Sequence, residues 1–475
     1  MKRFTLLLVF FAALSINVTA SANKERVVFL GEHTIGGWDW GTYLTIEGSS
    51  FGNLASVDKL SIVFESDDKT ASAAGQNYYQ YELIVENYDS RPQLASGSFE
   101  SGTTTIEVSL TDEQIANIKS NRLMIKGHFI KVKKVFYGQA NTTSAVSDES
   151  KLPYDTKEWD VDALGISLET LRTAKAGDKI VFNISSTYTA AGRDYCQAFL
   201  QGDGLEIGGS DLKDKSTAEY TLTDANIAAI ASTGYAQFVG KGVIVSSVNL
   251  VTHDYIYVLS STNSNVSLTG ISGTVDVELK RSYDWNATLC VPFDIASVTE
   301  TFGSTAKAYE FKEYDNGLVF VEREHIEAGK PYFMEFGVAD KDKTSISVSD
   351  VTINATLNNS DESNGLTFKG NYTPGMDMQG NYGVAWKDET DGWGFYKGGE
   401  GSKLNAFSAY FEGSIPSRSD SRLAVILVDE TSGIEDAIKN GEPRANSLFD
   451  LQGRKVAQPQ KGLYIVNGKK VFINK

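Results

Sequence analysis

Apolar and polar residues alternate in short runs along most of this chain. Runs at 59–64, 78–83 and 274–279 place apolar residues at every second position, and Gly, Asn or Asp residues separate such runs. A period of two is typical of β-strands with one buried face, whereas an amphipathic helix has a period of 3.6. The 43 glycines and the many Thr, Val, Tyr and Phe residues favour the same interpretation. We therefore predict an all-β protein.

One nine-residue segment occurs twice. Residues 110–118 (Leu-Thr-Asp-Glu-Gln-Ile-Ala-Asn-Ile) and 222–230 (Leu-Thr-Asp-Ala-Asn-Ile-Ala-Ala-Ile) share six identities. The flanking sequences also match in order, with a Trp-Asp pair and two strand patterns before the segment and a glycine-containing strand after it. A duplication of this length indicates two copies of one domain, which we place at residues 26–138 and 154–254.

Each copy of the repeated segment predicts a short capped helix. Thr111 followed by Gln114 fits a capping box, and two isoleucines share the face that can dock on a sheet. In the second copy Asn226 replaces the glutamine. We expect this change to weaken the reciprocal cap, with Thr223 retained as the N-cap.

The N-terminus is typical of a secretory signal peptide. Lys2 and Arg3 precede an apolar run that ends near Val18, and Ala20-Ser21-Ala22 fits a signal-peptidase site. We expect residues 1–22 to be removed and the protein to be extracellular or on the outer-membrane surface. The apolar run is too short for a membrane span and no other segment is long enough, so no transmembrane segment is expected.

Polar segments divide the rest of the chain. Residues 139–153 lack apolar periodicity and predict a linker between the two copies, and residues 430–447 predict a second linker. Residues 256–429 predict a third β-rich domain without similarity to the copies, with strands that include 274–279, 319–321 and 423–428. Residues 448–475 return to a strand pattern around two glycines.

The composition limits the possible partners. Removal of residues 1–22, which contain two basic residues and no acidic one, changes the formal charge from −17 to −19. Such a charge repels phosphate backbones, so nucleic acid is not an expected partner. Cys196 and Cys290 lie in different predicted domains, and we expect both to be buried as small apolar residues rather than joined in a disulfide.

Two tryptophans are candidate binding residues. Trp38 and Trp40 are two positions apart, so in a strand both indoles face the same way and could stack on the C–H face of a sugar. The alternative is that both pack into the core, because tryptophan is highly buried on average. The second copy retains only Trp159.

An aromatic residue and an amide recur on one face of both copies. In residues 78–85 the odd-numbered positions form the apolar row, so Tyr78 and Gln80 face the other way. Tyr195 and Gln197 hold the corresponding positions in the second copy. Such pairs suit the ring faces and hydroxyls of a sugar, although an outward row can also be a merely solvated face.

Signatures of metal binding and nucleophilic catalysis are weak. The four histidines are isolated and lack metal-ligand spacing, so we expect no metal site. They are His33, His128, His253 and His325. Neither cysteine lies in a nucleophile motif, and no Gly-x-Ser-x-Gly sequence occurs.

Acidic residues do not change this picture. The alternating acids at 158–162 could aim three carboxylates into one cleft, but the first copy lacks them and an acidic chain contains such pairs by chance. Asp203 and residues 388–391 could bind a structural calcium ion or lie in solvated turns. We therefore expect no enzymatic activity and no cofactor.

The first copy resembles a known class of domain. Its segments 29–33, 38–40 and 58–60, with the closing Leu110-Thr-Asp and Gly127, resemble the jelly-roll, carbohydrate-binding-module-like domains of secreted Bacteroidetes proteins. The second copy is similar to a more divergent member. The resemblance implies a jelly-roll β-sandwich for each copy, and a polysaccharide or glycoprotein glycan as the partner.

The C-terminal half also resembles proteins of this phylum. Residues 448–456 and 461–473 resemble the sorting domain of type IX secretion, although residues 433–446 replace its usual upstream part. The segments 285–293 and 328–332 resemble a β-domain found near the C-termini of surface proteins, which implies no activity.

Two functions are compatible with these features. The first is a secreted or cell-surface, non-catalytic carbohydrate-binding protein that uses tandem β-sandwich modules. The alternative is a structural or adhesive surface protein that binds a protein partner, with the β-domains as spacers and the Trp pair buried. The pattern does not indicate an oligomeric state.

Overall fold

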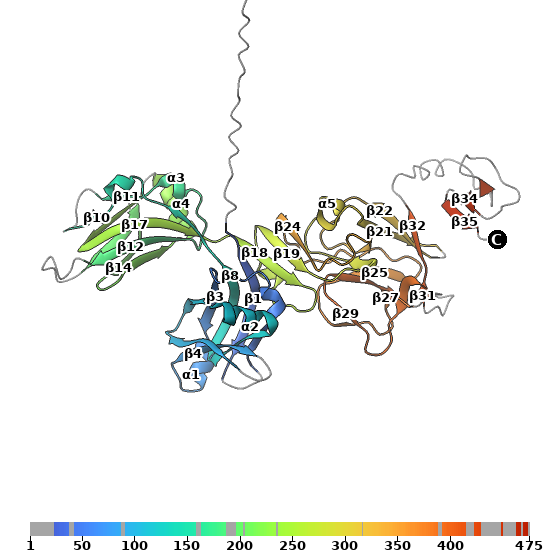
Figure 1. Cartoon of the computed structure of the whole chain (residues 1–475), viewed down its shortest axis with the longest axis horizontal. Coiled ribbons are helices and arrows are strands. Elements are labelled where there is room, and N and C mark those ends of the chain that lie inside the picture. Colours follow the sequence, from blue (N-terminus) through green and yellow to red (C-terminus); the bar gives the residue numbers. More distant parts are fainter. Residues whose placement is uncertain are drawn as a thin grey trace, which may run out of the picture. The chain divides into compact units, whose positions relative to one another are not determined.

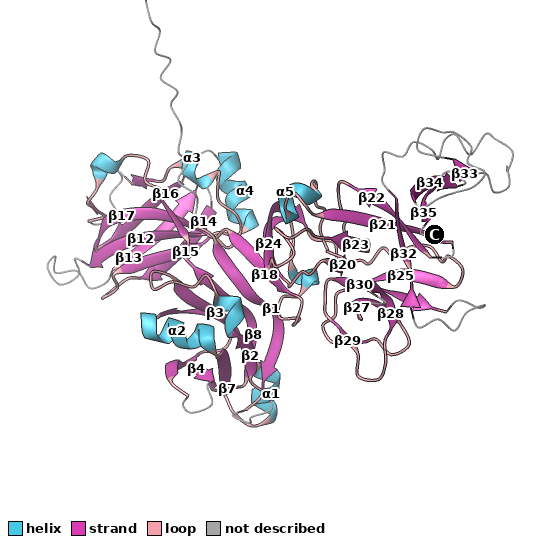
Figure 2. Cartoon of the chain, turned by 45° about the vertical axis from the view of Figure 1, so that its right-hand side comes forward, coloured by secondary structure: helices cyan, strands magenta, loops and turns pink. Residues whose placement is uncertain are grey.

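The computed structural model describes residues 23–37, 42–86, 91–157, 163–186, 196–202, 205–233, 236–315, 317–387, 392–414, 422–428, 448–449, 462–466 and 469–473. Most of the described elements are strands, which confirms the all-β prediction (Figure 1, Figure 2). The chain forms two compact units, Met1–Tyr257 and Val258–Lys475. None of the helices in these ranges has the length and hydropathy that a bilayer-spanning segment needs.

Several predicted features lie outside the described residues. They are the signal peptide at 1–22, Trp38, Trp40, Tyr195, the acids at 158–162 with Trp159, Asp203, residues 388–391 and the second predicted linker at 430–447.

The first predicted copy is an eight-stranded β-sandwich. One sheet contains the order β1-β8-β3-β6, and the other is β2-β7-β4-β5. This is a jelly-roll arrangement, as the resemblance implied, in which neighbours in a sheet are distant in sequence. The strands are β1 (Glu25–Ile35), β2 (Leu44–Glu47), β3 (Lys59–Ser66), β4 (Tyr79–Glu86), β5 (Gln93–Phe99), β6 (Thr103–Ser109), β7 (Arg122–His128) and β8 (Ile130–Gly138).

The second copy repeats this order strand for strand. Its sheets are β10-β17-β12-β15 and β11-β16-β13-β14. The duplication read from the sequence is therefore a duplication of the complete sandwich. The strands are β10 (Tyr154–Asp155), β11 (Leu164–Gly165), β12 (Lys179–Ser186), β13 (Gln197–Gly202), β14 (Leu205–Asp211), β15 (Thr217–Thr221), β16 (Ala236–Lys241) and β17 (Val243–Thr252).

The structure corrects the linker predicted at 139–153. β9 (Asn141–Ser144) pairs with the end of β17, while β10 pairs with its beginning, so together they occupy the place of the unbroken β1. The pair Ala145-Val146 is buried in the core of the second sandwich. Only residues 139–140 separate β8 from β9. The side chains of β9 are mostly exposed, and therefore polar, which hides the strand from a search for apolar periodicity.

Both repeated segments form the predicted capped helix. α2 (Asp112–Ser120) begins after Thr111, whose Oγ1 accepts from Gln114 N at 3.3 Å while Gln114 Oε1 accepts from Thr111 N at 2.9 Å. At α4 (Asp224–Thr233), Thr223 Oγ1 accepts from Asn226 N at 3.1 Å and Asn226 Oδ1 accepts from Thr223 N at 2.9 Å. The expectation of a weakened cap was wrong, because the shorter amide still reaches the Thr223 backbone.

The sheets of each sandwich pack through rings on alternate strand positions. Phe64 on β3 stacks on Tyr81 of β4 with centroids 5.1 Å apart, and Phe182 on β12 stacks on Phe238 of β16 at 4.2 Å. Burial of one such side chain contributes about 1.5–3 kcal/mol. Cys196 is buried and free, as predicted. The other helices of this unit are η1 (Gly48–Phe51), α1 (Asp68–Ala73), η2 (Glu149–Lys151) and α3 (Leu168–Leu171).

The end of the first unit returns to the first sandwich. β18 (Tyr255–Ser260) pairs in parallel with β1, from Glu25 opposite Tyr255 to Val27 opposite Tyr257. Lys134 is on β8, which lies on the other side of β1. Its ammonium group lies 3.1 Å from the ring centroid of Tyr255. Burial lowers the pKa of Lys134 to about 7, although the charge of Glu25 favours the protonated form.

The second unit contains a β-sandwich with a phenylalanine-rich core. Its sheets are β20-β23-β21-β22-β32 and β25-β30-β27-β28-β31, and β19 pairs with β24 in addition. Six buried rings fill the space between the sheets in tilted, stacked and edge-on contacts, which aromatic pairs favour. They are Phe311, Phe320, Phe333, Phe368, Phe395 and Phe411. Cys290 is also buried and free.

The predicted strand at 423–428 divides between the two sheets. β31 (Arg422–Leu423) pairs with β28, whereas β32 (Val425–Val428) pairs in parallel with β22. The remaining elements are β19 (Thr274–Lys280), β20 (Asn286–Leu289), β21 (Lys307–Tyr314), β22 (Leu318–Arg323), β23 (Tyr332–Glu335), β24 (Ser345–Thr352), β25 (Leu366–Asn371), β26 (Met376–Asp377), β27 (Tyr382–Trp386), β28 (Trp393–Lys397), β29 (Lys403–Leu404), β30 (Ser408–Gly413), η3 (Leu268–Gly270) and α5 (Val298–Phe302).

The C-terminal segment forms a small antiparallel sheet, as its strand pattern predicts. β34 (Gly462–Val466) pairs with both β33 (Leu448–Phe449) and β35 (Lys469–Ile473).

Candidate functional site

β4 presents its residues alternately to the two faces of its sheet, as predicted. Tyr79, Leu83 and Val85 are buried on the core side, whereas Gln80 and Glu82 on the outer side are only partly buried; Ile84, farther along the outer row, is buried. The alternation follows from the pleat of the strand. The outer face of this sheet is therefore where the predicted binding residues of the first copy lie.

Tyr78 packs against a histidine on this outer face. Its ring lies parallel to the imidazole of His128, with centroids 5.3 Å apart and an angle of 5° between the planes, and meets Phe129 edge-on at 5.8 Å. His128 is the cross-strand neighbour of Gln80. Tyr78 remains 37% exposed. We call Tyr78, Gln80 and His128 the Tyr78 patch.

Gly37, the described residue that precedes Trp38, lies close to this patch. An ideal Cβ on Gly37 would lie 3.6 Å from the imidazole of His128. Thr42, the next described residue, donates from its Oγ1 to the carbonyl of Gly37 at 3.2 Å. Trp38 and Trp40 themselves lie outside the described residues.

Two glycines, one in each sandwich, show that Gln80 and Gln197 occupy equivalent positions. A Cβ on Gly127 would lie 2.3 Å from the carbonyl oxygen of Gln80, and a Cβ on Gly240 would lie 2.6 Å from that of Gln197. Gln197 is opposite Lys241, which therefore takes the place of His128. The sequence alignment of Gln80 with Gln197 thus agrees with the strand register.

The two corresponding positions differ in chemistry. In the first copy Gln80 lies between His128 and Ser98, whereas in the second copy Gln197 lies between Lys241 and Asp211. The first position therefore combines aromatic rings with neutral polar groups, and the second is flanked by charges.

Charged residues beside the Tyr78 patch are paired with one another. Lys126 Nζ lies 2.9 Å from Glu82 Oε2, and Arg122 lies 3.3 Å from Glu47 and 3.9 Å from Glu86. Exposed pairs of this kind add little stability, about 0–1 kcal/mol each. Two cations are thus matched by three carboxylates, which leaves one net negative charge beside the patch.

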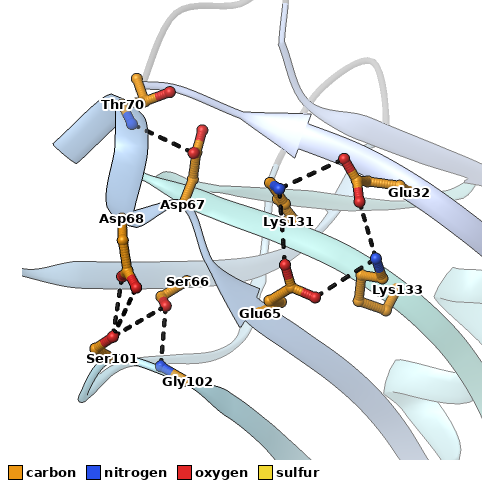
Figure 3. A network of polar contacts seen from close by, with 10 residues as sticks. All are labelled: Glu32, Glu65, Ser66, Asp67, Asp68, Thr70, Ser101, Gly102, Lys131 and Lys133. Atoms are coloured by element: carbon orange, nitrogen blue, oxygen red, sulfur yellow. Dashed lines mark hydrogen bonds and ion pairs between the residues drawn. The ribbon is translucent and has the colours of Figure 1, made fainter. Parts of the chain in front are cut away.

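The other sheet of the first sandwich has a charged outer face (Figure 3). Lys131 and Lys133 alternate with Glu32 and Glu65, with N–O distances of 2.9–3.6 Å. The hydrogen bond from Lys133 lowers the pKa of Glu32. These four charges balance. The outer face with the Tyr78 patch also carries ion pairs, those of Lys126 and Arg122, and it differs by the partly exposed ring of Tyr78.

A hydrogen-bond cluster holds the beginning of β4. Tyr79 Oη donates to Asp68 Oδ1 at 2.6 Å, and Ser101 Oγ donates to the same carboxylate at 2.9 and 3.0 Å (Figure 3 shows Asp68 and Ser101). The bond from Tyr79 is the main cause of the lowered pKa of Asp68. Because Tyr79 directly follows Tyr78 in the chain, this cluster fixes the backbone from which the Tyr78 ring projects.

His128 is the member of the patch that sequence reasoning missed. It was considered only as a metal ligand, although its position after Gly127 places it opposite Gln80. Among the residues that the structure describes, no group of three or more His, Cys, Asp or Glu side chains is placed to hold a metal ion.

No protein-family model matches this chain, and no curated protein sequence matches it. Among solved structures, part of it is similar to the Bacteroides ovatus protein SGBP-B of a mixed-linkage glucan utilization locus, solved with a mixed-linkage heptasaccharide. The identity is 17%, the TM-score is 0.20, and the match covers 24% of this chain and 29% of that protein.

Two further structures show similarities of the same kind. The glycosylasparaginase PNGase F of Flavobacterium meningosepticum matches with 11% identity and a TM-score of 0.15, over 49% of this chain and 90% of that one. The CBM22 tandem domain of Paenibacillus barcinonensis Xyn10C matches with 9% identity and a TM-score of 0.14, over 41% and 78%. All three TM-scores are below 0.5, so none defines the function of this chain.

Proposed function

We propose that this protein is a secreted, non-catalytic carbohydrate-binding protein and that the first sandwich binds a glycan at the Tyr78 patch. The observation that carries the proposal is the partly exposed Tyr78 ring, held parallel to His128 and beside the Gln80 amide. A pyranose has an apolar C–H face and a rim of hydroxyls, so an aromatic ring next to an amide complements both of its surfaces.

Other features of the first unit support this proposal. Gly37, the residue before Trp38, lies beside His128, and Thr42 Oγ1 donates to the carbonyl of Gly37; we propose that Trp38 and Trp40 contribute to the same site. The neighbouring carboxylate of Glu82 is ion-paired with Lys126, a structural rather than a catalytic arrangement. We propose that the second sandwich, with charges around Gln197, binds more weakly or serves as a spacer.

Affinity electrophoresis of the mature full-length protein tests the proposal. Gels containing barley β-glucan, xyloglucan, arabinoxylan, galactomannan or mucin glycans should retard the wild type in at least one case, and Tyr78→Ala should reduce that retardation. Val57→Ala, which changes another exposed side chain, is the matched control. Equal retardation of wild type and Tyr78→Ala in every gel would contradict binding at the patch. Mobility unaffected by all glycans would favour the alternative of an adhesive protein with a protein partner.

We also propose that residues 1–22 direct export and that the C-terminal sheet takes part in type IX sorting. Deletion of residues 448–475 should then trap the protein in the periplasm of a type IX-competent host. Unchanged appearance at the cell surface would contradict the sorting role.

A further inference from the structure

In the second unit, one polar row lies at the end of the phenylalanine-rich core. Lys307, Glu335 and Asn286 are aligned across β21, β23 and β20. Two positions along each strand from these polar residues lies a buried residue: Tyr309 on β21, Phe333 on β23 and Thr288 on β20. Tyr309 and Phe333 belong to the phenylalanine-rich core. Because side chains alternate along a strand, this polar row faces the other sheet rather than the outside.

In the opposite sheet, two tryptophans likewise lie on the side that faces the core, at the end of that sheet's row of buried residues. Trp386 and Trp393 are cross-strand partners on β27 and β28, and their rings meet edge-on with centroids 5.9 Å apart. Trp393 is two residues before the buried Phe395. Trp386 nevertheless remains 52% exposed. The indoles therefore line an open end of the sandwich, where the core gives way to solvent (strands labelled in Figure 2).

A third tryptophan completes this end. A hollow of about 480 Å³ is lined by Trp285, Trp393, Asn286 and Glu335. Trp285 is 42% exposed, and the Lys341 ammonium lies 5.4 Å from its ring centroid, close enough to help orient the indole. The volume falls within the range of about 300–1,000 Å³ typical of small-molecule sites. Trp386 does not line the hollow itself but packs edge-on against Trp393, which does. We call Trp285, Asn286, Glu335, Trp386 and Trp393 the tryptophan end.

The polar groups here are already held in place. Tyr309 Oη donates to Glu335 Oε2 at 2.7 Å, and Lys307 Nζ lies 3.0 Å from Glu322 Oε2. The Asn286 amide adds a donor and an acceptor to the carboxylate of Glu335. Lys307 is thus charge-paired and Glu335 is oriented by a hydrogen bond, so the hollow suits an uncharged ligand that both donates and accepts hydrogen bonds.

We infer that the tryptophan end is a second carbohydrate site, which binds a neutral pyranose ring between exposed indoles and the Asn286–Glu335 pair. Large indole faces complement the C–H faces of a sugar, and the amide and carboxylate complement its hydroxyls. A polyanion is disfavoured by Glu335 and by the net charge of the chain, −17. This site is separate from the Tyr78 patch and does not depend on it.

Calorimetric titration of the mature full-length protein tests the site. The probes are barley β-glucan, xyloglucan, arabinoxylan and galactomannan, with heparin as the anionic comparison. Trp285→Ala and Trp386→Ala should each lower the affinity for a neutral polysaccharide about tenfold, and Trp285→Phe should restore part of the loss because it retains a ring. Binding should also change the tryptophan fluorescence of the Tyr78→Ala variant.

The outcomes distinguish the two proposed sites. Loss of binding in Tyr78→Ala with unchanged affinity in both tryptophan variants would overturn the second site and leave the first intact. Loss only in the tryptophan variants would support the second site and contradict the first. Binding of heparin alone, or of no neutral polysaccharide, would overturn the inference. Circular dichroism and thermal melting of Trp285→Phe verify that the fold is retained.

Discussion

Gly127 lies against the backbone of Gln80, so closely that a Cβ on Gly127 would come within 2.3 Å of the Gln80 carbonyl oxygen. The same relationship joins Gly240 to Gln197 in the second sandwich, at 2.6 Å. The strand beneath the candidate site thus requires a glycine in each copy, because real side chains do not approach a carbonyl so closely.

Substitution of either glycine should destabilise the first unit. Gly127→Ala and Gly240→Ala should each lower the free energy of unfolding by about 1–3 kcal/mol, since the strands must separate to admit the methyl group. Denaturant titration measures the loss. Gly36→Ala is the control, because nothing lies within 4 Å of its Cβ position. Equal stability of Gly127→Ala and Gly36→Ala would refute the close approach.

His128 should act on binding through the orientation of Tyr78. His128→Ala removes the stacked ring and should weaken glycan affinity about two- to tenfold, the equivalent of roughly 0.5–1.5 kcal/mol for an aromatic pair. His128→Phe keeps a ring parallel to Tyr78 and should restore most of the affinity. Titration calorimetry with a bound polysaccharide compares the three proteins. If His128→Phe binds as weakly as His128→Ala, stacking is not the role of this residue.

The helix caps should contribute similarly in both copies. Thr111→Ala and Thr223→Ala should each destabilise the protein by about 1 kcal/mol, a typical value for loss of an N-cap. Asn226→Ala should cost less than either, roughly 0.3–0.5 kcal/mol, because it removes the bonds that Asn226 Oδ1 accepts from Thr223 but leaves Thr223 Oγ1 to cap the helix. Thermal melts monitored by circular dichroism provide the comparison. No effect of Asn226→Ala would mean that its amide does not cap the helix.

Lys134 should make stability depend on pH. Its pKa of about 7 in the folded protein is below the value of an unfolded lysine, because burial disfavours the charge. The cost of burying the ammonium is therefore fully present below pH 7, and it falls as the pH rises from 7 toward the unfolded pKa, about 10.4.

Lys134→Met removes this dependence. The gain in unfolding free energy over wild type should be larger at pH 6 than at pH 9 by about 2–3 kcal/mol, at about 1.4 kcal/mol per pH unit above pH 7. Urea titrations at both pH values measure it. A difference that is the same at pH 6 and pH 9 would show that Lys134 remains charged in the folded protein throughout this range.

Sequence periodicity predicted the strands that have one buried face. The odd-numbered row of β4 and the repeated capped segment could be read from the chain because each follows a local rule. β9 could not, because its side chains are mostly exposed and only pairing with β17 makes it a strand. The crossing of residues 422–428 from one sheet to the other depends equally on distant partners.

The candidate binding residues also divide into those that a local pattern predicts and those that depend on distant strand pairing. The outward position of Gln80 followed from alternation, whereas its neighbour His128 depends on cross-strand register. The tryptophan end joins residues from 285 to 393 across two sheets, a separation over which no local pattern gives information.

The joint of residues 139–140 between β8 and β9 has a consequence for recognition of a long polymer. Two residues span at most about 7 Å even when extended. Asn141 also exchanges two hydrogen bonds with the backbone of Asn23, at 2.8 and 2.9 Å. We expect this short joint to limit how far the second sandwich can turn or move relative to the first. A polymer that contacts both sandwiches need not order them again, so less of its interaction energy is lost on binding.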